Sequence, residues 1–402
     1  MHTKVDKRIY IHTMGGRTPQ KTGGRQRICG VRPRKGTPIC DTSVDGVWVL
    51  MKKLLRSPLI FAFGLFLLLQ ASAFAEDPSG IVEGEAIASP PLVKAACAEG
   101  EVVYYTAQAD TDEREILKAF EKQFPCVHVS VISAVTGRLF ERIKTETESG
   151  HPQADVMLGT DEALAQKLVE AGHVRTWTPP SASLYPANAK VEGEWYAASG
   201  SLILPVYNTD FVKPDGAPKS WKDLLRPEFK GKLSASPISI GGTAWMQFAF
   251  LIDKFGDDFI RKFAEQQPRL FTSYNTVALS VARGETFVGV TSALNEYPLR
   301  TAQHAPINAV YAEEGTPLAN YPMLLLKDGP HPNAGELMAN WYLSKQGQSN
   351  LVRVRGAYSV RDDVAPAPGN PKLSDVKPWN PGHAEIVRQY GAVIEKITEM
   401  MN

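Results

Sequence analysis

Long apolar runs, common catalytic motifs and clustered cysteines are all rare or missing in this sequence. The longest apolar run, residues 59–69, falls well short of the roughly 20 residues that a membrane-spanning helix needs. No Gly-x-Ser-x-Gly elbow, His-Glu-x-x-His pair or cluster of Cys and His occurs, and these are the usual local signatures of hydrolases and metalloenzymes. Residues 96–402 also contain no heptads, low-complexity tracts or tandem repeats. These absences argue against a membrane anchor and against an enzyme recognisable by its motifs.

The short apolar run belongs to a pattern typical of a secretory signal peptide. Met51 and a basic head from Lys52 to Arg56 precede it, and the small residues Ala73 and Ala75 stand at the positions that signal cleavage requires. Residues 51–75 are therefore predicted to direct export to the periplasm. No cysteine follows Ala75 directly, which argues against a lipid anchor.

The segment before this signal is expected to lack a packed core, and the segment after it to be a leader or linker. Residues 1–50 are basic, rich in Gly and Thr and poor in apolar side chains, so they bury too little surface to offset the entropy of ordering the chain. We expect them to be disordered or not translated, with initiation at Met51. Residues 76–95, rich in Pro, Gly and Ala, are expected to form a leader or linker.

Export would change the charge that a partner encounters. The chain has 44 Lys and Arg and 43 Asp and Glu, of which 13 basic and 3 acidic side chains lie in residues 1–75. The remaining chain holds 31 basic and 40 acidic groups, a net charge of −9. A nucleic-acid partner needs a basic surface that releases counterions from phosphates, so we expect none.

Signal cleavage would leave two of the 4 cysteines, Cys97 and Cys126, because Cys29 and Cys40 lie upstream. Each remaining cysteine stands just before a predicted strand, and neighbouring parallel strands would bring these strand starts together. In an oxidising compartment the pair predicts one disulfide. Two buried thiols are the alternative.

Short β-rich runs alternate with amphipathic helices after residue 96, which is typical of parallel sheets covered by helices. The first part predicts strands at 102–106, 127–132 and 155–158, and helices at 113–124, 137–148 and 162–171. An extended stretch at 195–207 leads to a second part with strands at 232–235 and 286–290 and helices at 244–254 and 257–265. A returning strand at 321–326 precedes helices at 333–343 and 382–400. The pattern predicts two α/β lobes that share several crossings.

Several segments carry a family resemblance. The main ones are Gly-Glu-Trp-Tyr-Ala at 193–197, Val-Tyr-Asn-Thr at 206–209, Pro-Lys-Ser-Trp-Lys-Asp-Leu-Leu at 218–225 and Pro-Glu-Phe-Lys-Gly-Lys at 227–232. Smaller ones are Val-Tyr-Tyr-Thr at 103–106, Ala-Asp-Val at 154–156, Gly-Glu at 284–285 and Ser-Lys-Gln-Gly-Gln at 344–348. Together they closely resemble periplasmic solute-binding proteins of ABC importers. The branch they are most similar to contains binders of ferric iron, phosphonates and phosphosugars.

This resemblance implies a type II periplasmic-binding-protein fold: two α/β lobes, each a mostly parallel sheet covered by helices, with a ligand cleft between them. It also implies a monomer without cofactor or enzymatic activity that captures a small solute and hands it to an ABC permease in the inner membrane. Residues 96–206 and 318–345 are expected to form lobe I, and residues 207–317 and 346–402 lobe II. Ligand sensing through a membrane receptor leaves the same sequence signature and stays an alternative.

Polar loops at the carboxyl ends of the strands are the candidate ligand site, because ligands of open α/β sheets bind there. Thr136 and Gly137 start one predicted helix with Arg138 beside them, and Gly242 and Thr243 start another in the second lobe. Free amides, hydroxyls and a guanidinium favour a phosphonate, phosphate ester or carboxylate, whereas simple capping by Thr136 is the alternative. Position alone adds Thr106, Gln108, Thr160, Asp161, Ser199, Ser201, Tyr274, Asn275, Thr291 and Ser292.

Ferric iron is the competing ligand, because the iron-binding branch matches the segments around Trp195 and Tyr207 well. Ala109 stands where many iron binders have a histidine, and residues 290–294 contain no tyrosine where those proteins have an adjacent pair. Ser201 replaces the arginine that helps to hold a synergistic anion. Because ferric iron prefers phenolate or carboxylate oxygens, an iron site here would need a different cluster, drawn from Tyr274, Tyr297, Tyr311 and Tyr321.

An enzyme on the same fold is the third alternative. Its only notable nucleophile is Cys126, which would have to be a reactive thiolate. A disulfide with Cys97 is incompatible with that role, so the state of Cys126 separates the two hypotheses.

Overall fold

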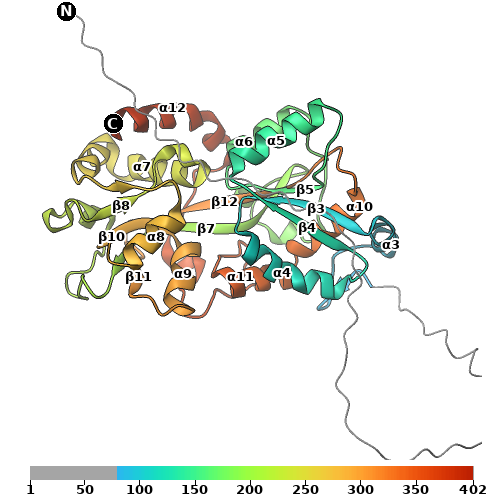
Figure 1. Cartoon of the computed structure of the whole chain (residues 1–402), viewed down its shortest axis with the longest axis horizontal. Coiled ribbons are helices and arrows are strands. Elements are labelled where there is room, and N and C mark those ends of the chain that lie inside the picture. Colours follow the sequence, from blue (N-terminus) through green and yellow to red (C-terminus); the bar gives the residue numbers. More distant parts are fainter. Residues whose placement is uncertain (1–78, 402) are drawn as a thin grey trace, which may run out of the picture. The chain divides into compact units, whose positions relative to one another are not determined.

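The computed structural model describes residues 79–401, so the predicted signal peptide, the upstream segment, Cys29 and Cys40 lie outside the described residues. In the described part, eleven strands form one sheet in the order β4-β3-β5-β12-β7-β10-β8-β9, with three short strands paired to β7 and β12 (Figure 1). A separate hairpin of β1 (Ile81–Val82) and β2 (Glu85–Ala86) precedes it. No helix within residues 79–401 combines the length and the apolarity needed to cross a membrane.

The sheet consists of two parallel halves joined by two long strands. In one half, β3 (Glu101–Thr106) pairs in parallel with β4 (His128–Ser133) and with β5 (Val156–Leu158). In the other half, β8 (Leu233–Ala235) pairs in parallel with β9 (Arg269–Leu270) and with β10 (Val288–Ser292). The joining strands, β7 (Trp195–Asn208) and β12 (Thr316–Leu325), are antiparallel to each other and almost completely buried. The short strands are β6 (Lys190–Val191), β11 (Ile307–Ala309) and β13 (Pro378–Trp379).

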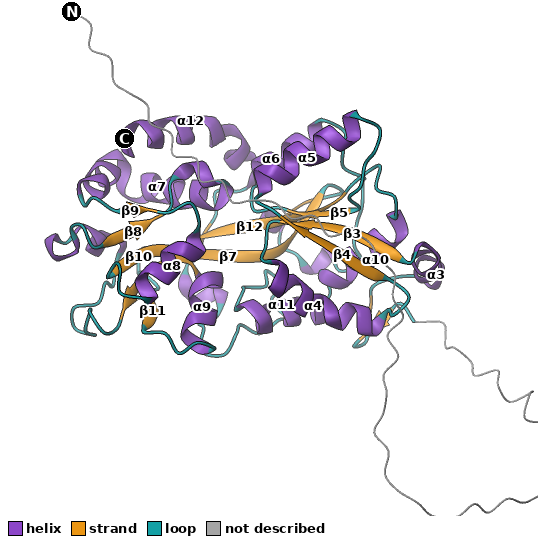
Figure 2. Ribbon diagram, in the orientation of Figure 1, coloured by secondary structure: helices purple, strands orange, loops and turns teal. Residues whose placement is uncertain are grey.

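Helices cover both faces of this sheet (Figure 2). In that view α5 (Thr136–Glu148), α6 (Glu162–Glu170), α7 (Gly242–Glu265) and α12 (His383–Met401) lie above the strands. Below them lie α4 (Asp110–Gln123), α9 (Ala293–Thr301) and α11 (Lys345–Arg355). The other helices are α3 (Pro90–Glu99), α8 (Tyr274–Ala282) and α10 (Pro332–Tyr342). This arrangement confirms the predicted α/β class with parallel strands covered by helices.

Most predicted elements are present with small shifts at their ends. The two helices predicted at 244–254 and 257–265 form α7, which is interrupted at Gly256, where φ is 72°. A positive φ is easily adopted by glycine, so the break lies where the sequence placed it. The helices α8, α9 and α11 have no counterpart among the predicted elements.

The predicted leader contains regular structure. Besides the β1–β2 hairpin, α3 starts inside it, with Ser89 accepting a hydrogen bond from the Leu92 amide and two prolines in the first turn. Proline is tolerated there because the first amides of a helix have no partner within it. The composition predicted a linker because proline usually breaks a helix. Composition alone does not show that these prolines stand at the start of a helix, where they are tolerated.

The described cysteines form a disulfide, as predicted. Cys97, near the end of α3, is bonded to Cys126, which precedes β4. Glu101 of β3 lies opposite His128 of β4, so the two strand starts are neighbours. Cys126 is consequently not available as the thiolate that the enzyme alternative requires.

Removing this disulfide should destabilise the protein without changing its fold. The bond closes a loop with a sequence separation of 29, and the chain-entropy model assigns about 3 to 4 kcal/mol to a loop of this size. We expect the double variant Cys97→Ala/Cys126→Ala to lose that amount of unfolding free energy in urea denaturation. An unchanged denaturation midpoint would contradict the expectation.

A buried carboxyl connects α4 to α10 and α11. Glu113 is inaccessible to solvent, accepts a hydrogen bond from the Tyr342 hydroxyl at 3.0 Å and lies 3.4 Å from the Tyr104 hydroxyl. The Arg355 guanidinium at the end of α11 approaches it to 3.6 Å. Burial raises the pKa of Glu113 to about 7, and Arg355 only partly opposes this effect. The cluster packs α11 against α4, within the half of the sheet formed by β3 to β5, although the sequence analysis placed residues 346–402 in lobe II.

The raised pKa predicts a pH-dependent stability. Between pH 4.5, the ordinary pKa of the carboxyl, and about 7, the unfolded state binds fewer protons than the folded state, so stability falls as the pH rises through this window. Glu113→Gln removes the titration, so its loss of stability from pH 5 to pH 8 should be smaller than that of the wild type by up to roughly 3 kcal/mol. Denaturant titrations at both pH values measure this, with Glu115→Gln on the same helix as control. Equal losses in the wild type and Glu113→Gln would show that Glu113 does not titrate in this window.

Candidate functional site

The loops after β3 and β4 are held together by hydrogen bonds. Thr106, the last residue of β3, is buried, and its hydroxyl accepts a hydrogen bond from the Gln108 amide at 3.1 Å. Ser133, at the end of β4, donates its hydroxyl to the Gln108 carbonyl oxygen at 2.5 Å. Parallel pairing places both strand ends at one edge of the sheet, as predicted for the candidate site.

The start of α5 lies next to these loops and is joined to the loop after β5. The hydroxyls of Thr136 and Thr160 are 2.9 Å apart, and the Thr136 hydroxyl also accepts the Thr160 amide at 3.0 Å. The N-cap residue is Val135, which makes no side-chain hydrogen bond to the helix, so capping by Thr136 does not occur. The Arg138 amide donates to the Val135 carbonyl oxygen at 2.9 Å, whereas the amides of Thr136 and Gly137 precede the first acceptor of the helix. Gly137 and Arg138 are exposed.

The start of α7 meets the first half of the sheet at the same place. A Cβ atom on Gly242 would lie 2.6 Å from the Thr160 carbonyl oxygen and 2.7 Å from the Asp161 Cα, so only glycine permits this approach. The next residue, Thr243, is buried with its hydroxyl 3.3 Å from the Tyr321 hydroxyl of β12. The helix starts from the two halves are therefore in direct contact.

Further hydrogen-bonded polar residues lie after β9 and at the end of β10. Tyr274, the first residue of α8, donates its hydroxyl to Gln247 at 2.8 Å, and the Thr291 hydroxyl donates to the Tyr274 carbonyl oxygen at 2.6 Å. Ser292 caps α9 by position, and its hydroxyl accepts a hydrogen bond from Asn295 at 2.7 Å. Asn275, beside Tyr274, is exposed.

Three further predicted residues, Asp161, Ser199 and Ser201, are also buried. Asp161 is 1 % exposed, caps α6 by accepting the amides of Ala163 and Leu164, and accepts a further hydrogen bond from the Tyr390 hydroxyl. Burial raises its pKa. Ser199 and Ser201 are buried in β7, and the Ser201 hydroxyl has no hydrogen-bond partner among residues 79–401. The carboxylate of Asp161 is thus fully engaged, whereas the Ser201 hydroxyl is not.

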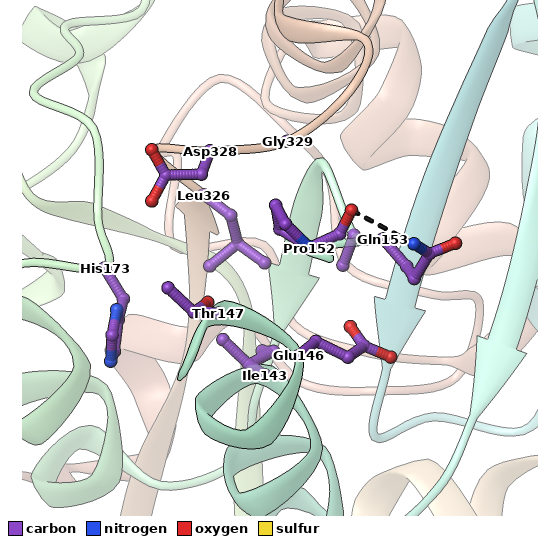
Figure 3. Close-up of a pocket in the computed structure, with 10 residues that line it drawn as sticks. Ile143, Glu146, Thr147, Pro152, Gln153, His173, Leu326, Asp328 and Gly329 are labelled. Carbon is purple, nitrogen blue, oxygen red and sulfur yellow. Dashed lines mark hydrogen bonds between the residues drawn. The ribbon is translucent and has the colours of Figure 1, made fainter. Parts of the chain in front are cut away.

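Two hollows lie near these elements. The one in Figure 3 is lined by the last turns of α5, including Glu146 and Thr147, by His173 and by Asp328. It contains no predicted site residue and lies at the opposite end of α5 from Arg138, about 12 to 14 Å along the helix. The second hollow is lined by residues at the meeting of the two helix starts: Thr160, Asp161, Glu162, Gly242, Trp245, Met246, Ala319, Asn320 and Ile386. The predicted site therefore adjoins the second hollow and not the first.

A family model for bacterial extracellular solute-binding proteins matches residues 151–388. The chain belongs to this family. As the family resemblance implied, it is a solute-binding protein.

Relatives and solved structures agree with this assignment. A putative 2-aminoethylphosphonate-binding periplasmic protein of Salmonella typhimurium is 26% identical over 302 residues, 68% of this chain and 84% of that protein. An Fe(3+)-binding periplasmic protein of Serratia marcescens is 25% identical over 299 residues, 71% and 85% of the two chains. Iron-bound HitA from Pseudomonas aeruginosa has a TM-score of 0.66 at 19% identity, covering 75% of this chain and 99% of its own. AfuA from Actinobacillus pleuropneumoniae, solved with fructose-6-phosphate, also reaches 0.66, at 24% identity with coverages of 75% and 98%. These likenesses confirm the type II periplasmic-binding-protein fold.

The four tyrosines considered as iron ligands do not form one cluster in this solute-binding protein. Tyr274 and Tyr321 both lie beside Thr243, whereas the Tyr311 hydroxyl lies 3.4 Å from that of Tyr358 and the Tyr297 ring packs against Gly356. Burial raises the pKa of Tyr274 well above its usual value, with a further contribution from Tyr321. Residues 79–401 also contain no group of three or more His, Cys, Asp or Glu placed to hold a metal ion.

Sequence reasoning missed Gln247, Tyr390 and the role of Ser133. Gln247 is a fully buried amide inside an otherwise apolar stretch of α7, and that isolated polar residue was a usable signal. Tyr390 contacts Asp161, which lies 229 positions earlier in the sequence. No local sequence pattern predicts such a contact. Tyr321 was considered only as an iron ligand, although its hydroxyl lies 3.3 Å from the Thr243 hydroxyl.

Ferric iron should not form tyrosinate bonds in this protein. The Tyr274 hydroxyl is buried and donates to Gln247, so forming a phenolate there would cost both burial of a charge and a hydrogen bond. We expect no visible tyrosinate-to-iron absorption band when ferric citrate is added to the purified protein. A band that disappears in Tyr274→Phe or Tyr321→Phe would overturn this expectation.

Proposed function

We propose that this protein captures a small anionic solute, a phosphonate, phosphate ester or carboxylate, in the periplasm and delivers it to an ABC permease. The observation that carries the proposal is the uncapped start of α5, where the free amides of Thr136 and Gly137 lie beside the exposed Arg138. Such a turn combines hydrogen-bond donors with the positive end of the helix dipole, and a guanidinium adds a charged donor. The names of the phosphonate-binding relative and of the fructose-6-phosphate complex support the same ligand class.

The surrounding groups are suited to orienting such an anion. Five hydroxyl groups from both halves of the sheet can donate as well as accept hydrogen bonds. They belong to Thr106, Ser133, Thr136, Thr160 and Thr243. We propose that the solute binds between the two halves and that Asn275, on the second half, completes the contact. Asp161 is assigned to the framework, because both of its oxygens already accept hydrogen bonds.

We propose that the two halves are the lobes of a clamp. On this proposal β3, β4 and β5 belong to lobe I and β8, β9 and β10 to lobe II, with β7 and β12 as shared crossings, which is compatible with the strand order. A solute that bridges both lobes would shift an open ensemble towards a closed one, and closure would signal loading to the permease. The protein would act as a monomer that is exported through residues 51–75, and its disulfide suits that oxidising compartment.

A screen of purified protein by thermal denaturation tests the ligand class. The probes are 2-aminoethylphosphonate, fructose 6-phosphate, citrate, ferric citrate, glucose and spermidine. A probe present at a hundred times its Kd stabilises the folded state by about 2.7 kcal/mol, roughly 4 to 8 °C for a domain of this size. We expect such a shift from one of the iron-free anions. A shift produced only by ferric citrate, by glucose or by spermidine would reject the proposal in favour of iron, a neutral solute or a cation.

Arg138→Ala tests where the anion binds. Because hydrogen bonds to charged groups contribute more than neutral ones, its loss should weaken binding of the stabilising anion at least about tenfold. Lys144→Ala removes one positive charge from the other end of α5 and serves as control. Isothermal titration measures both variants, and their melting temperatures show that folding is intact. Equal affinity in Arg138→Ala and wild type would remove Arg138 from the site.

A further inference from the structure

The C-terminal helix α12 contacts helices from both halves of the sheet. In Figure 1 it lies over α7, with its first turn beside α6 and its end at the C-terminus. Packing between α12 and each of these helices confirms the view. Since α6 belongs to the β5 side and α7 to the β8 side, α12 is a connection between the two parts besides the crossings β7 and β12.

Its contacts with α6 are made by hydrogen bonds to buried carboxylates. His383 lies with one ring nitrogen 3.2 Å from the Glu162 carboxylate and the other 2.9 Å from the Gln166 amide oxygen. About two turns later, Tyr390 donates its hydroxyl to Asp161. Glu162 is 4 % exposed and Asp161 1 %, so water does not readily replace these partners.

Helix α12 also contacts α7. The Trp245 indole donates to the Tyr390 carbonyl oxygen at 3.2 Å, and the two rings stack with centroids 6.2 Å apart. Further along, Lys396 pairs with Asp257 at 3.1 Å. Tyr390 thus touches both sides at once, with its hydroxyl on the start of α6 and its ring and backbone on α7.

The groups beneath Tyr390 are already in close contact. Gly242 leaves no room for a side chain against Thr160 and Asp161, so backbone packs on backbone between the two helix starts. Strands β3 and β4 lie farther from the central crossings than β5 does, and on the other side β8 and β9 lie farther than β10. Rotation about the contact at Gly242 would therefore move the loops after β3 and β4 most.

We propose that α12 is a strap that fixes the contact between the starts of α6 and α7 and makes this contact the pivot of the clamp. The inference rests on the proposed clamp motion but not on the identity of the solute. In this proposal Asp161 and Gly242 belong to the pivot. The distance between α5 and α8 is the one that increases when the clamp opens. In the absence of the strap, the same crossings would permit a wider range of lobe orientations.

Distance measurements between spin labels test the strap in the full chain, in which Cys29→Ser and Cys40→Ser remove the two other cysteines. Labels are attached at Glu141→Cys on α5 and Thr276→Cys on α8, two exposed positions outside the proposed site; the bonded pair Cys97–Cys126 does not react. In this background Tyr390→Phe removes the hydroxyl that reaches Asp161 but keeps the ring. Without added solute, we expect the population at long distances to rise roughly fivefold or more relative to the parent.

Tyr185→Phe is the matched control, because it also removes a buried hydroxyl hydrogen bond, to the Leu343 carbonyl oxygen at 2.9 Å, away from α12. His383→Gln provides a second, independent strap variant should Tyr390→Phe fail to fold. A rise in the strap variants with an unchanged control supports the proposal. Unchanged distances in the strap variants, or an equal change in Tyr185→Phe, would overturn it. Neither result depends on the thermal screen, so failure of the proposed ligand class remains distinguishable.

Discussion

The antiparallel pairing of β7 with β12 is the interaction on which the rest of the structure depends. Leu202 to Tyr196 run alongside Leu318 to Met323, with one irregularity between Tyr321 and Pro322, and nearly every side chain of both strands is buried. Two parallel half-sheets attach to this pair from opposite sides. Because their carboxyl ends face the same region, hydroxyls from loops far apart in the chain meet there.

This geometry explains why the site is made largely of hydroxyls and backbone amides. Helix starts at Thr136, Gly242 and Tyr274 lie in one region, and buried Thr side chains connect them. Donors of this kind are fixed by the backbone and lose little freedom on binding. In the proposed site, the exposed Arg138 would add charge without placing an unpaired cation in the interior.

The sequence predicted those features of the fold that depend on residues close together in the chain. Alternation of β-rich runs and amphipathic helices located β3, β4, β5 and β7, and Gly256 located the break in α7. The disulfide followed from the positions of two cysteines before neighbouring strands. What could not be predicted depends on distant residues: the Asp161 carboxylate accepts a hydrogen bond from Tyr390, and Ser201 is buried within the sheet. The helix that begins at Pro90 depends in the same way on a distant partner, because α3 packs against α10.

The disulfide has a mechanical consequence. Cys97 and Cys126 precede two adjacent strands of the same half-sheet, and neither β7 nor β12 lies inside the loop that they close. The covalent crosslink and the joint between the half-sheets are therefore independent of each other. Oxidation of this pair therefore stiffens one half-sheet and adds no constraint on the proposed rotation of that half against the other.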